Sequence, residues 1–282
     1  MNTICIKTNN NNAINYLLEK LKKYDFNDIS FSCRKFRVFH NLFLHYKGSD
    51  FKKFICNISN LLTSLIIDIY EDDIIKKIIS SNYFYFNTIE QKEILQKFKY
   101  IRENDVETSY IKEKKLFNAF GDLLEQNKKI FLKGVITFRL FDYIQELTEE
   151  MDSTVNQYLI EKEYNEFVSL LRLYVNTETS RVNSVHLIYK DSSPILLDEN
   201  KNIIKIESNM LNAKYLSDIT FSNSDIALNT LLNILPKKIF IHLIDEKPDE
   251  FITTLELIFE NRVVICTDCN ICNIYKAKKA SH

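Results

Sequence analysis

Glycine and proline are scarce in this chain of 282 residues, with only three of each. Phosphate-binding loops, dinucleotide-binding fingerprints and nucleophile elbows need clustered glycines, because their backbone approaches a ligand closely or adopts a positive φ. Gly48, Gly121 and Gly134 are scattered along the chain and build none of these motifs. The scarcity therefore excludes most of the common nucleotide-binding enzymes.

Long apolar runs are also missing. No run reaches the roughly 18 apolar residues of a membrane-spanning helix, and Asp68 interrupts the richest stretch, residues 61–70. The first residues lack the apolar region of a signal peptide. Six cysteines, three of them bunched near the end, do not resemble a secreted disulfide scaffold. We therefore expect a cytoplasmic protein with reduced thiols and no membrane insertion.

Histidine is infrequent, with five residues in the whole chain. None lies in an HExxH, HxE or HD arrangement, so the signatures of metallohydrolases and zinc deaminases are absent. No histidine occurs between His45 and His186, which excludes the Glu-x-x-His pairs of di-iron helical bundles. We predict no catalytic residues and favour a protein that is not an enzyme.

Charge is balanced overall but uneven along the chain. The net charge is −1 and the pI is about 6.5, which argues against nucleic acid as the main partner. Residues 1–60 hold ten Lys and Arg against four acids, whereas residues 142–178 hold nine acids against Lys162 and Arg172. The simplest interpretation is that the basic and the acidic regions are solvent-exposed surfaces or attract each other. Nucleic-acid binding by the basic N-terminal part is the alternative.

Hydrophobic periodicity predicts an α+β protein in three regions. Residues 1–48 read as a small β-α-β-β unit, with strands near 4–7, 29–33 and 37–46 and a helix near 13–24. Residues 49–178 form a central helical bundle of five or six helices, one of them capped at Thr88 and one spanning 132–147. Residues 179–282 alternate strands and helices and predict a C-terminal α/β layer.

Three cysteines form the most specific local motif. Cys266, Cys269 and Cys272 stand at two consecutive two-residue gaps directly after a predicted strand, a spacing that points the thiols to one centre. Tetrahedral zinc needs a fourth ligand, which Cys5, Cys33, Cys56, a histidine or a second chain could supply. Zinc is therefore the one cofactor that the sequence suggests. Buried, inert thiols are the alternative.

Two other interpretations of the cysteines, an iron–sulfur site and a thiol-redox centre, agree less well with the sequence. A bacterial ferredoxin run would continue with a fourth cysteine and a proline, but this chain has Lys276 and Ala277 there. A thiol-redox centre should open a helix, and we expect only a short basic tail after Cys272.

Arg139 is the one candidate for an anion-binding or buried ion-pair site. It lies in an otherwise apolar predicted helix, with Tyr143 one turn further on. An arginine in such a helix either pairs with an acid, for which we name Glu163, or binds an anionic ligand. Pairing is the simpler interpretation.

Several sequence blocks resemble the YtxC-like family of sporulation proteins. The blocks are residues 133–140 (KGVITFRL), Tyr143, Asp152, 158–164 (YLIEKEY), 166–167, 170–172, 236–239 (PKKI) and 262–266 (RVVIC) with the cysteines that follow. The resemblance implies an endospore-forming bacterial host and a role in sporulation. It implies no reaction and transfers no catalytic residue.

These observations favour a non-catalytic cytoplasmic sporulation factor that acts through another protein. A zinc-binding or thiol-redox protein using Cys266, Cys269 and Cys272 is the first alternative. A nucleic-acid-binding protein using the basic N-terminal unit is the second.

Overall fold

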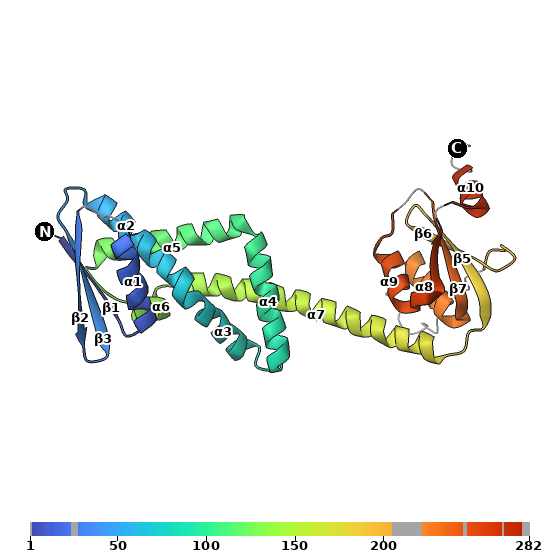
Figure 1. The fold of residues 1–282 in the computed structure, drawn as a ribbon, viewed down its shortest axis with the longest axis horizontal. Helices are drawn as coiled ribbons and strands as arrows, with labels where there is room; N and C mark the ends of the chain where they lie inside the picture. The colour runs from blue at the N-terminus through green and yellow to red at the C-terminus, as the bar shows by residue number, and fades with distance from the viewer. Residues whose placement is uncertain (1, 24–27, 205–221, 245–246, 267, 278–282) are drawn as a thin grey trace. The chain divides into compact units, whose positions relative to one another are not determined.

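The α+β fold is confirmed by a computed structural model that describes residues 2–23, 28–204, 222–244, 247–266 and 268–277 (Figure 1). The chain divides into two compact units, residues 1–160 and 161–282. Each unit holds one four-stranded sheet, and the long helix α7 (Phe141–Thr177) contributes residues to both units.

Unit 1 begins with the expected β-α-β-β order. The elements are β1 (Asn2–Thr8), α1 (Asn11–Lys23), β2 (Ile29–Phe36) and β3 (Phe39–Tyr46). Together with β4 (Lys129–Phe131) they build sheet A in the order β2-β3-β1-β4. β1 pairs antiparallel with β3 and parallel with β4.

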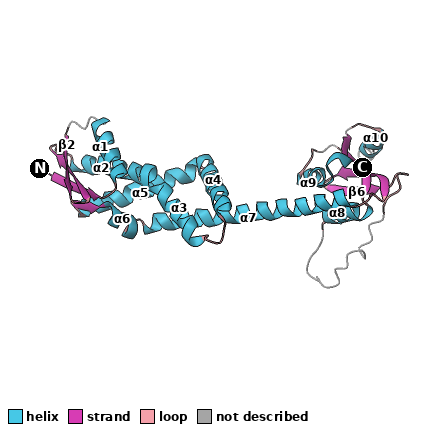
Figure 2. Cartoon of the chain, turned by 60° about the horizontal axis from the view of Figure 1, so that its bottom comes forward, coloured by secondary structure: helices cyan, strands magenta, loops and turns pink. Residues whose placement is uncertain are grey.

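Sheet A is packed on one face. Every second residue of β1 and β3 is buried, including Ile4, Ile6, Leu42 and Leu44, as the two-residue period of a half-buried strand requires. These side chains share one hydrophobic core with the apolar face of α1 and with the helices that follow. Figure 2 shows helix predominating in unit 1, with the strands of sheet A gathered at one end of it.

The helices of unit 1 are α2 (Phe51–Leu65), a π-helical turn η1 (Ile66–Tyr70), α3 (Glu71–Asn82), α4 (Thr88–Asn104), α5 (Val106–Gln126) and α6 (Leu132–Phe138). The N-terminal cap of α4 lies one residue before the predicted cap at Thr88, and it forms a capping box. Asn87, not Thr88, caps α4, because its side chain accepts from the backbone N–H groups of Ile89 and Glu90 while the Glu90 carboxylate accepts from the Asn87 N–H.

The continuous helical stretch Phe51–Asn82 is long and apolar enough to cross a membrane by length and composition alone. More than half of its most apolar window is buried inside the protein, and its apolar side chains belong to the core of unit 1. Packing against that core accounts for its hydrophobicity.

The predicted boundary at residue 48 does not divide the structure. β4 follows the helices α2 to α5 and returns to pair with β1, so that residues 1–48 and the helical region enclose one core. The helix predicted over 132–147 is also interrupted, because α6 ends at Phe138 and α7 begins at Phe141. The boundary between the two units falls within α7, near residue 160, rather than at residue 178.

Unit 2 contains sheet B in the order β6-β5-β7-β8. Its strands are β5 (Val182–Lys190), β6 (Ser193–Leu197), β7 (Pro236–Leu243) and β8 (Val263–Cys266), and its helices are α8 (Asn223–Ile234), α9 (Glu250–Phe259) and α10 (Asn270–Ala277). The sequence predicts a meander of three short strands in this unit, near 184–190, 195–198 and 203–206. The third is present only as a bridge between Leu197 and Ile203, and residues 205–206 lie outside the described chain.

Sheet B is covered on both faces. The side chains of Ile239, Ile241 and Leu243 pack in one core with α8, α9 and the end of α7. On the opposite face, Ile188 and Leu197 pack against Ile271 and Cys272 of α10. An isolated helix as short as α10 is marginal in water, because helix nucleation is costly. Its position therefore depends on contacts with the sheet.

Candidate metal centre

The three predicted cysteine ligands meet on the α10 side of sheet B. Cys266 is the last residue of β8, Cys269 directly precedes α10, and Cys272 lies in its first turn. The Sγ atom of Cys272 lies 3.6 Å from that of Cys269 and 4.0 Å from that of Cys266. The sulfur atoms therefore face one common centre.

His242 completes the group of potential ligands. It lies on β7, directly opposite Cys266 in the parallel pairing with β8. Its Nδ1 atom is 3.4 Å from the Sγ atoms of both Cys269 and Cys272, and one ligand atom from each of the four residues lies within 4.8 Å of the others. Among the alternatives that the sequence leaves open for the fourth ligand, this geometry favours a histidine.

The spacing fits a tetrahedral zinc ion. Zn–S bonds of about 2.3 Å and Zn–N bonds of about 2.0 Å place tetrahedral sulfur atoms about 3.8 Å apart, and sulfur and nitrogen atoms about 3.5 Å apart. The S–S distances of 3.6 and 4.0 Å and the N–S distances of 3.4 Å lie close to these values. Three cysteines and one histidine also form a common ligand set of structural zinc sites.

The surroundings keep His242 in its ligand form. The side chain is almost completely buried, and burial together with the charge of His186 lowers the pKa of His242 to about 4. Its imidazole is therefore neutral near pH 7. His186 on β5 lies beside it, with its Nδ1 atom 2.9 Å from His242 Nε2. A proton on His242 Nε2 leaves Nδ1 as a lone-pair donor toward the sulfur atoms.

The cysteine thiols differ in acidity. Burial pushes the pKa of Cys269 upward, but hydrogen bonds from the backbone N–H groups of Cys272 and Ile271 and from the neighbouring thiols outweigh it, so the pKa lies below its ordinary value. Burial raises the pKa of Cys272 to about 11, and the hydrogen bond that its protonated thiol shares with the Cys269 sulfur adds to the increase. A bound cation would favour the thiolate form of each ligand.

The structure differs from the sequence interpretation at the C-terminal tail. A helix, α10, does follow Cys269, and the N–H of Cys272 lies 3.5 Å from the Cys269 sulfur. The objection that no helix follows the cysteines therefore does not hold. Cys5, Cys33 and Cys56 belong to unit 1 and are not members of this group of ligands.

The residues of the second predicted site lie in different surroundings. Arg139 follows the last residue of α6 with an exposed side chain, and Glu163 is exposed on α7. Neither has an ion-pair partner within its own unit among the described residues, and both the pairing of Arg139 with Glu163 and anion binding by Arg139 stay predictions. Tyr143 is buried, and its hydroxyl donates to the Glu71 carboxylate, which also pairs with Arg102. Arg102, rather than Arg139, is therefore the arginine that pairs with a buried acid next to Tyr143.

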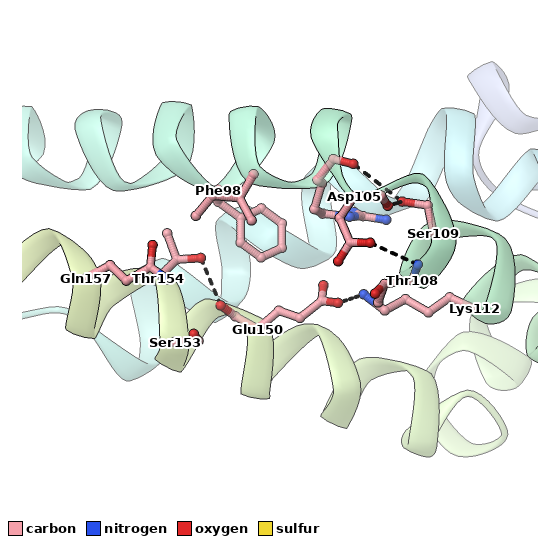
Figure 3. A pocket seen from close by; sticks show the side chains of 11 residues that line it. Phe98, Asp105, Thr108, Ser109, Lys112, Glu150, Ser153, Thr154 and Gln157 are labelled. Carbon is pink, nitrogen blue, oxygen red and sulfur yellow. Dashed lines mark hydrogen bonds and ion pairs between the residues drawn. The ribbon is translucent and has the colours of Figure 1, made fainter.

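A small pocket of about 180 Å³ lies beside this network, between α4, α5 and α7 (Figure 3). Lys112 and Glu150 form an ion pair across it, and the Asp105 carboxylate accepts from the Thr108 N–H. Because both cations that line it already have carboxylate partners, Lys112 in Glu150 and Arg102 in Glu71, we assign the pocket to helix packing rather than to ligand binding.

These features define a two-unit α+β protein with a Cys₃His cluster of metal-ligand type. The chain belongs to the YtxC-like family, whose model matches residues 56–264. It is similar to the uncharacterized protein YtxC of Bacillus subtilis strain 168, with 23% identity over 209 residues that cover 72% of this chain and 74% of that protein. No solved structure matches it. The family match includes His242 and ends before Cys266.

Proposed function

We propose that the protein is a zinc-binding protein in which Cys266, Cys269, Cys272 and His242 hold one structural zinc ion. The observation that carries the proposal is the convergence of three sulfur atoms and one imidazole nitrogen at tetrahedral spacing. Four protein ligands leave no coordination position for a substrate. The ion would fasten α10 to the ends of β7 and β8 and so stabilise unit 2.

Elemental analysis of the full-length protein tests this proposal. Protein purified without a histidine tag under reducing conditions should contain about one zinc per chain, as expected for a single four-ligand site. Cys272→Ser and His242→Asn should lose most of the metal. Cys33→Ser and Cys56→Ser are matched controls, because both thiols are exposed and lie in unit 1, and they should retain it.

Two results would contradict the zinc proposal. Wild-type protein that takes up no zinc when the ion is supplied under reducing conditions has no such site. A protein with all three C-terminal cysteines replaced by serine that still binds stoichiometric zinc must hold it elsewhere. Circular dichroism of every variant separates loss of metal from loss of the whole fold.

A thiol-redox function is a second candidate, favoured by the position of Cys269 immediately before α10 and by its lowered pKa. Oxidation of Cys269 and Cys272 to a disulfide would release two electrons and two protons, which an acceptor disulfide would take up to give two thiols. Reversible disulfide formation in the zinc-free protein would support this candidate. Zinc-loaded protein whose thiols resist alkylation would argue for the structural role.

The expected role in sporulation is part of the same proposal. The family resemblance supports a role in sporulation, and the lack of catalytic signatures in the sequence supports a non-catalytic cytoplasmic factor that acts through another protein. A closed metal site is compatible with such a role. Disruption of the gene in its bacterial host should lower the yield of heat-resistant spores and leave vegetative growth unchanged. Restoration by the wild-type gene but not by one encoding Cys272→Ser would connect the centre to the role.

A further inference from the structure

Sheet A has one face that no described element of unit 1 covers. The helices of unit 1 gather on the other face (Figure 1), and the burial of β1 and β3 alternates accordingly. On the uncovered face, Phe43 lies at the centre of the sheet, between Ser32 of β2 and Cys5 of β1 in the strand register. We call this surface the open face of sheet A.

The strand register places aromatic and basic side chains together on the open face. One row across the sheet runs Arg34, Asn41, Lys7 and Phe131, and the next runs Ser32, Phe43, Cys5 and Lys129. Successive rows on one face are about 7 Å apart, because side chains of a strand alternate at about 3.4 Å per residue.

The aromatic rings of the open face do not belong to the core. Phe39, Phe43 and Phe131 are absent from the hydrophobic cluster that fills unit 1. Phe43 and His45 lie parallel with their centroids 6.5 Å apart, and Lys7 Nζ lies 4.1 Å from the centroid of Phe39. Flat rings held beside cations on a sheet surface are suited to stacking against other flat, electron-rich rings.

The strands of sheet A carry charge of one sign. β1, β2, β3 and β4 contain no aspartate or glutamate, although Asp28 directly precedes β2 and Asp50 follows the turn after β3. The strands and the turn between β2 and β3 hold five basic residues, namely Lys7, Arg34, Lys35, Arg37 and Lys129. Their basic character is therefore concentrated around one sheet, although the whole chain is nearly neutral, and an anionic partner fits it.

We propose that the open face of sheet A binds single-stranded nucleic acid, with Lys7, Arg34 and Lys129 facing phosphates and Phe43 stacking against a base. An unpaired strand offers both negative charge and exposed bases, whereas a duplex hides its bases. A second copy of the chain fits less well, because two identical basic faces would repel. This inference concerns unit 1 and is independent of the zinc proposal.

Binding of labelled oligothymidylate and oligouridylate to the full-length protein tests the inference, measured by fluorescence anisotropy at several salt concentrations. The wild type should bind one or both, and comparison of the two distinguishes DNA from RNA. Lys7→Gln combined with Arg34→Gln should reduce the slope of log K against log salt by about 1.4, since each neutralised phosphate contributes about 0.7 for single strands. Phe43→Leu should weaken binding at least about fivefold and leave that slope unchanged.

Matched controls use exposed residues on the helices of unit 1. Lys76→Gln combined with Lys92→Gln removes the same charge, and Tyr100→Leu removes an exposed ring, so both variants should bind as the wild type does. Thermal unfolding verifies that each variant is folded.

Three results would overturn the inference. The first is absence of binding to either oligonucleotide at low salt. The second is equal competition by duplex DNA, because a stacking role for Phe43 requires exposed bases. The third is a dimer in analytical ultracentrifugation that Phe43→Leu dissociates, because a second copy then covers the face.

Discussion

His186 Nδ1 lies 2.9 Å from His242 Nε2, so one imidazole orients the other beside the three cysteines. Such hydrogen bonds to a metal-binding histidine fix its tautomer, and their loss commonly costs about 10–100-fold in metal affinity. We predict that His186→Ala binds zinc with an affinity lower by about that factor and with unchanged stoichiometry. Competition with a chromophoric chelator measures the affinity.

His40→Ala is a matched control, because His40 also bonds a neighbouring side chain, Asn11, but lies in unit 1. It should leave zinc affinity unchanged. An unchanged affinity in His186→Ala would show that the contact between the two histidines does not orient His242.

Removal of zinc should loosen unit 2 selectively. α10 and β8 carry the cysteine side of the proposed site, and a ligand that binds only the native state adds to its stability. Hydrogen exchange in the presence of a strong chelator should therefore speed up at the backbone amides of β8 and α10. The amides of α4 and α5, which belong to the core of unit 1, should exchange at their former rate. Uniform acceleration throughout the chain would contradict this prediction.

The sequence is informative about the cysteines and less so about their partner. The spacing of Cys266, Cys269 and Cys272 predicts that they converge, because it is local. His242 lies 24 positions before Cys266 in the numbering and becomes its neighbour only when β7 and β8 pair in parallel. The two-residue alternation of β7 does place His242 on the face of the strand that points away from the core residues Ile241 and Leu243. The pattern cannot show which strand lies beside β7.

Arg139 and Arg102 illustrate a similar limit. Arg139 is flanked by apolar residues, yet it follows the end of a seven-residue helix and is exposed. Arg102 lies in the polar last turn of α4 and is largely buried, because Glu71 and Tyr143 approach it from other helices. The burial of a charged side chain therefore depends on contacts between helices that the local pattern does not contain.

The pairing of β4 with β1 is another feature that periodicity could not predict. Periodicity indicates the type of an element, and it does so for the longer strands β1 and β3. β4 holds only three residues, Lys129–Phe131, which are too few to show a strand period. Four helices separate it from β3 in the sequence, so that its return to β1 is a long-range contact. For this reason the sequence suggests a boundary at residue 48 that the structure does not have.

The network of Glu71, Arg102 and Tyr143 should stabilise unit 1 strongly. Arg102→Met leaves the carboxylate of Glu71 buried without its cation, which typically costs about 3–5 kcal/mol of unfolding free energy. Tyr143→Phe removes one hydrogen bond to a charged acceptor and should cost about 1–3 kcal/mol. Urea unfolding of the full-length protein, followed by circular dichroism, measures both values.

Lys99→Met is the control for the network, because it breaks an ion pair with Asp72 in which both side chains are well exposed. Exposed pairs contribute less than about 1 kcal/mol. If Arg102→Met were no more destabilising than Lys99→Met, the buried network would have no special role in stability.

Tyr83 should make the protein less stable in alkali. Burial raises its pKa well above the ordinary value of 10, and the hydrogen bond that its hydroxyl donates to Asp152 raises it further. Between pH 10 and the folded-state pKa, the unfolded chain releases this proton and the folded chain keeps it. The unfolding free energy should therefore fall with rising pH by up to about 1.4 kcal/mol per pH unit from this one group.

In Tyr83→Phe, the unfolding free energy measured with urea should decline correspondingly less steeply between about pH 10 and pH 11. Tyr100→Phe removes an exposed hydroxyl and should decline as the wild type does; identical slopes for all three proteins would mean that Tyr83 ionises equally easily in the folded and unfolded chains.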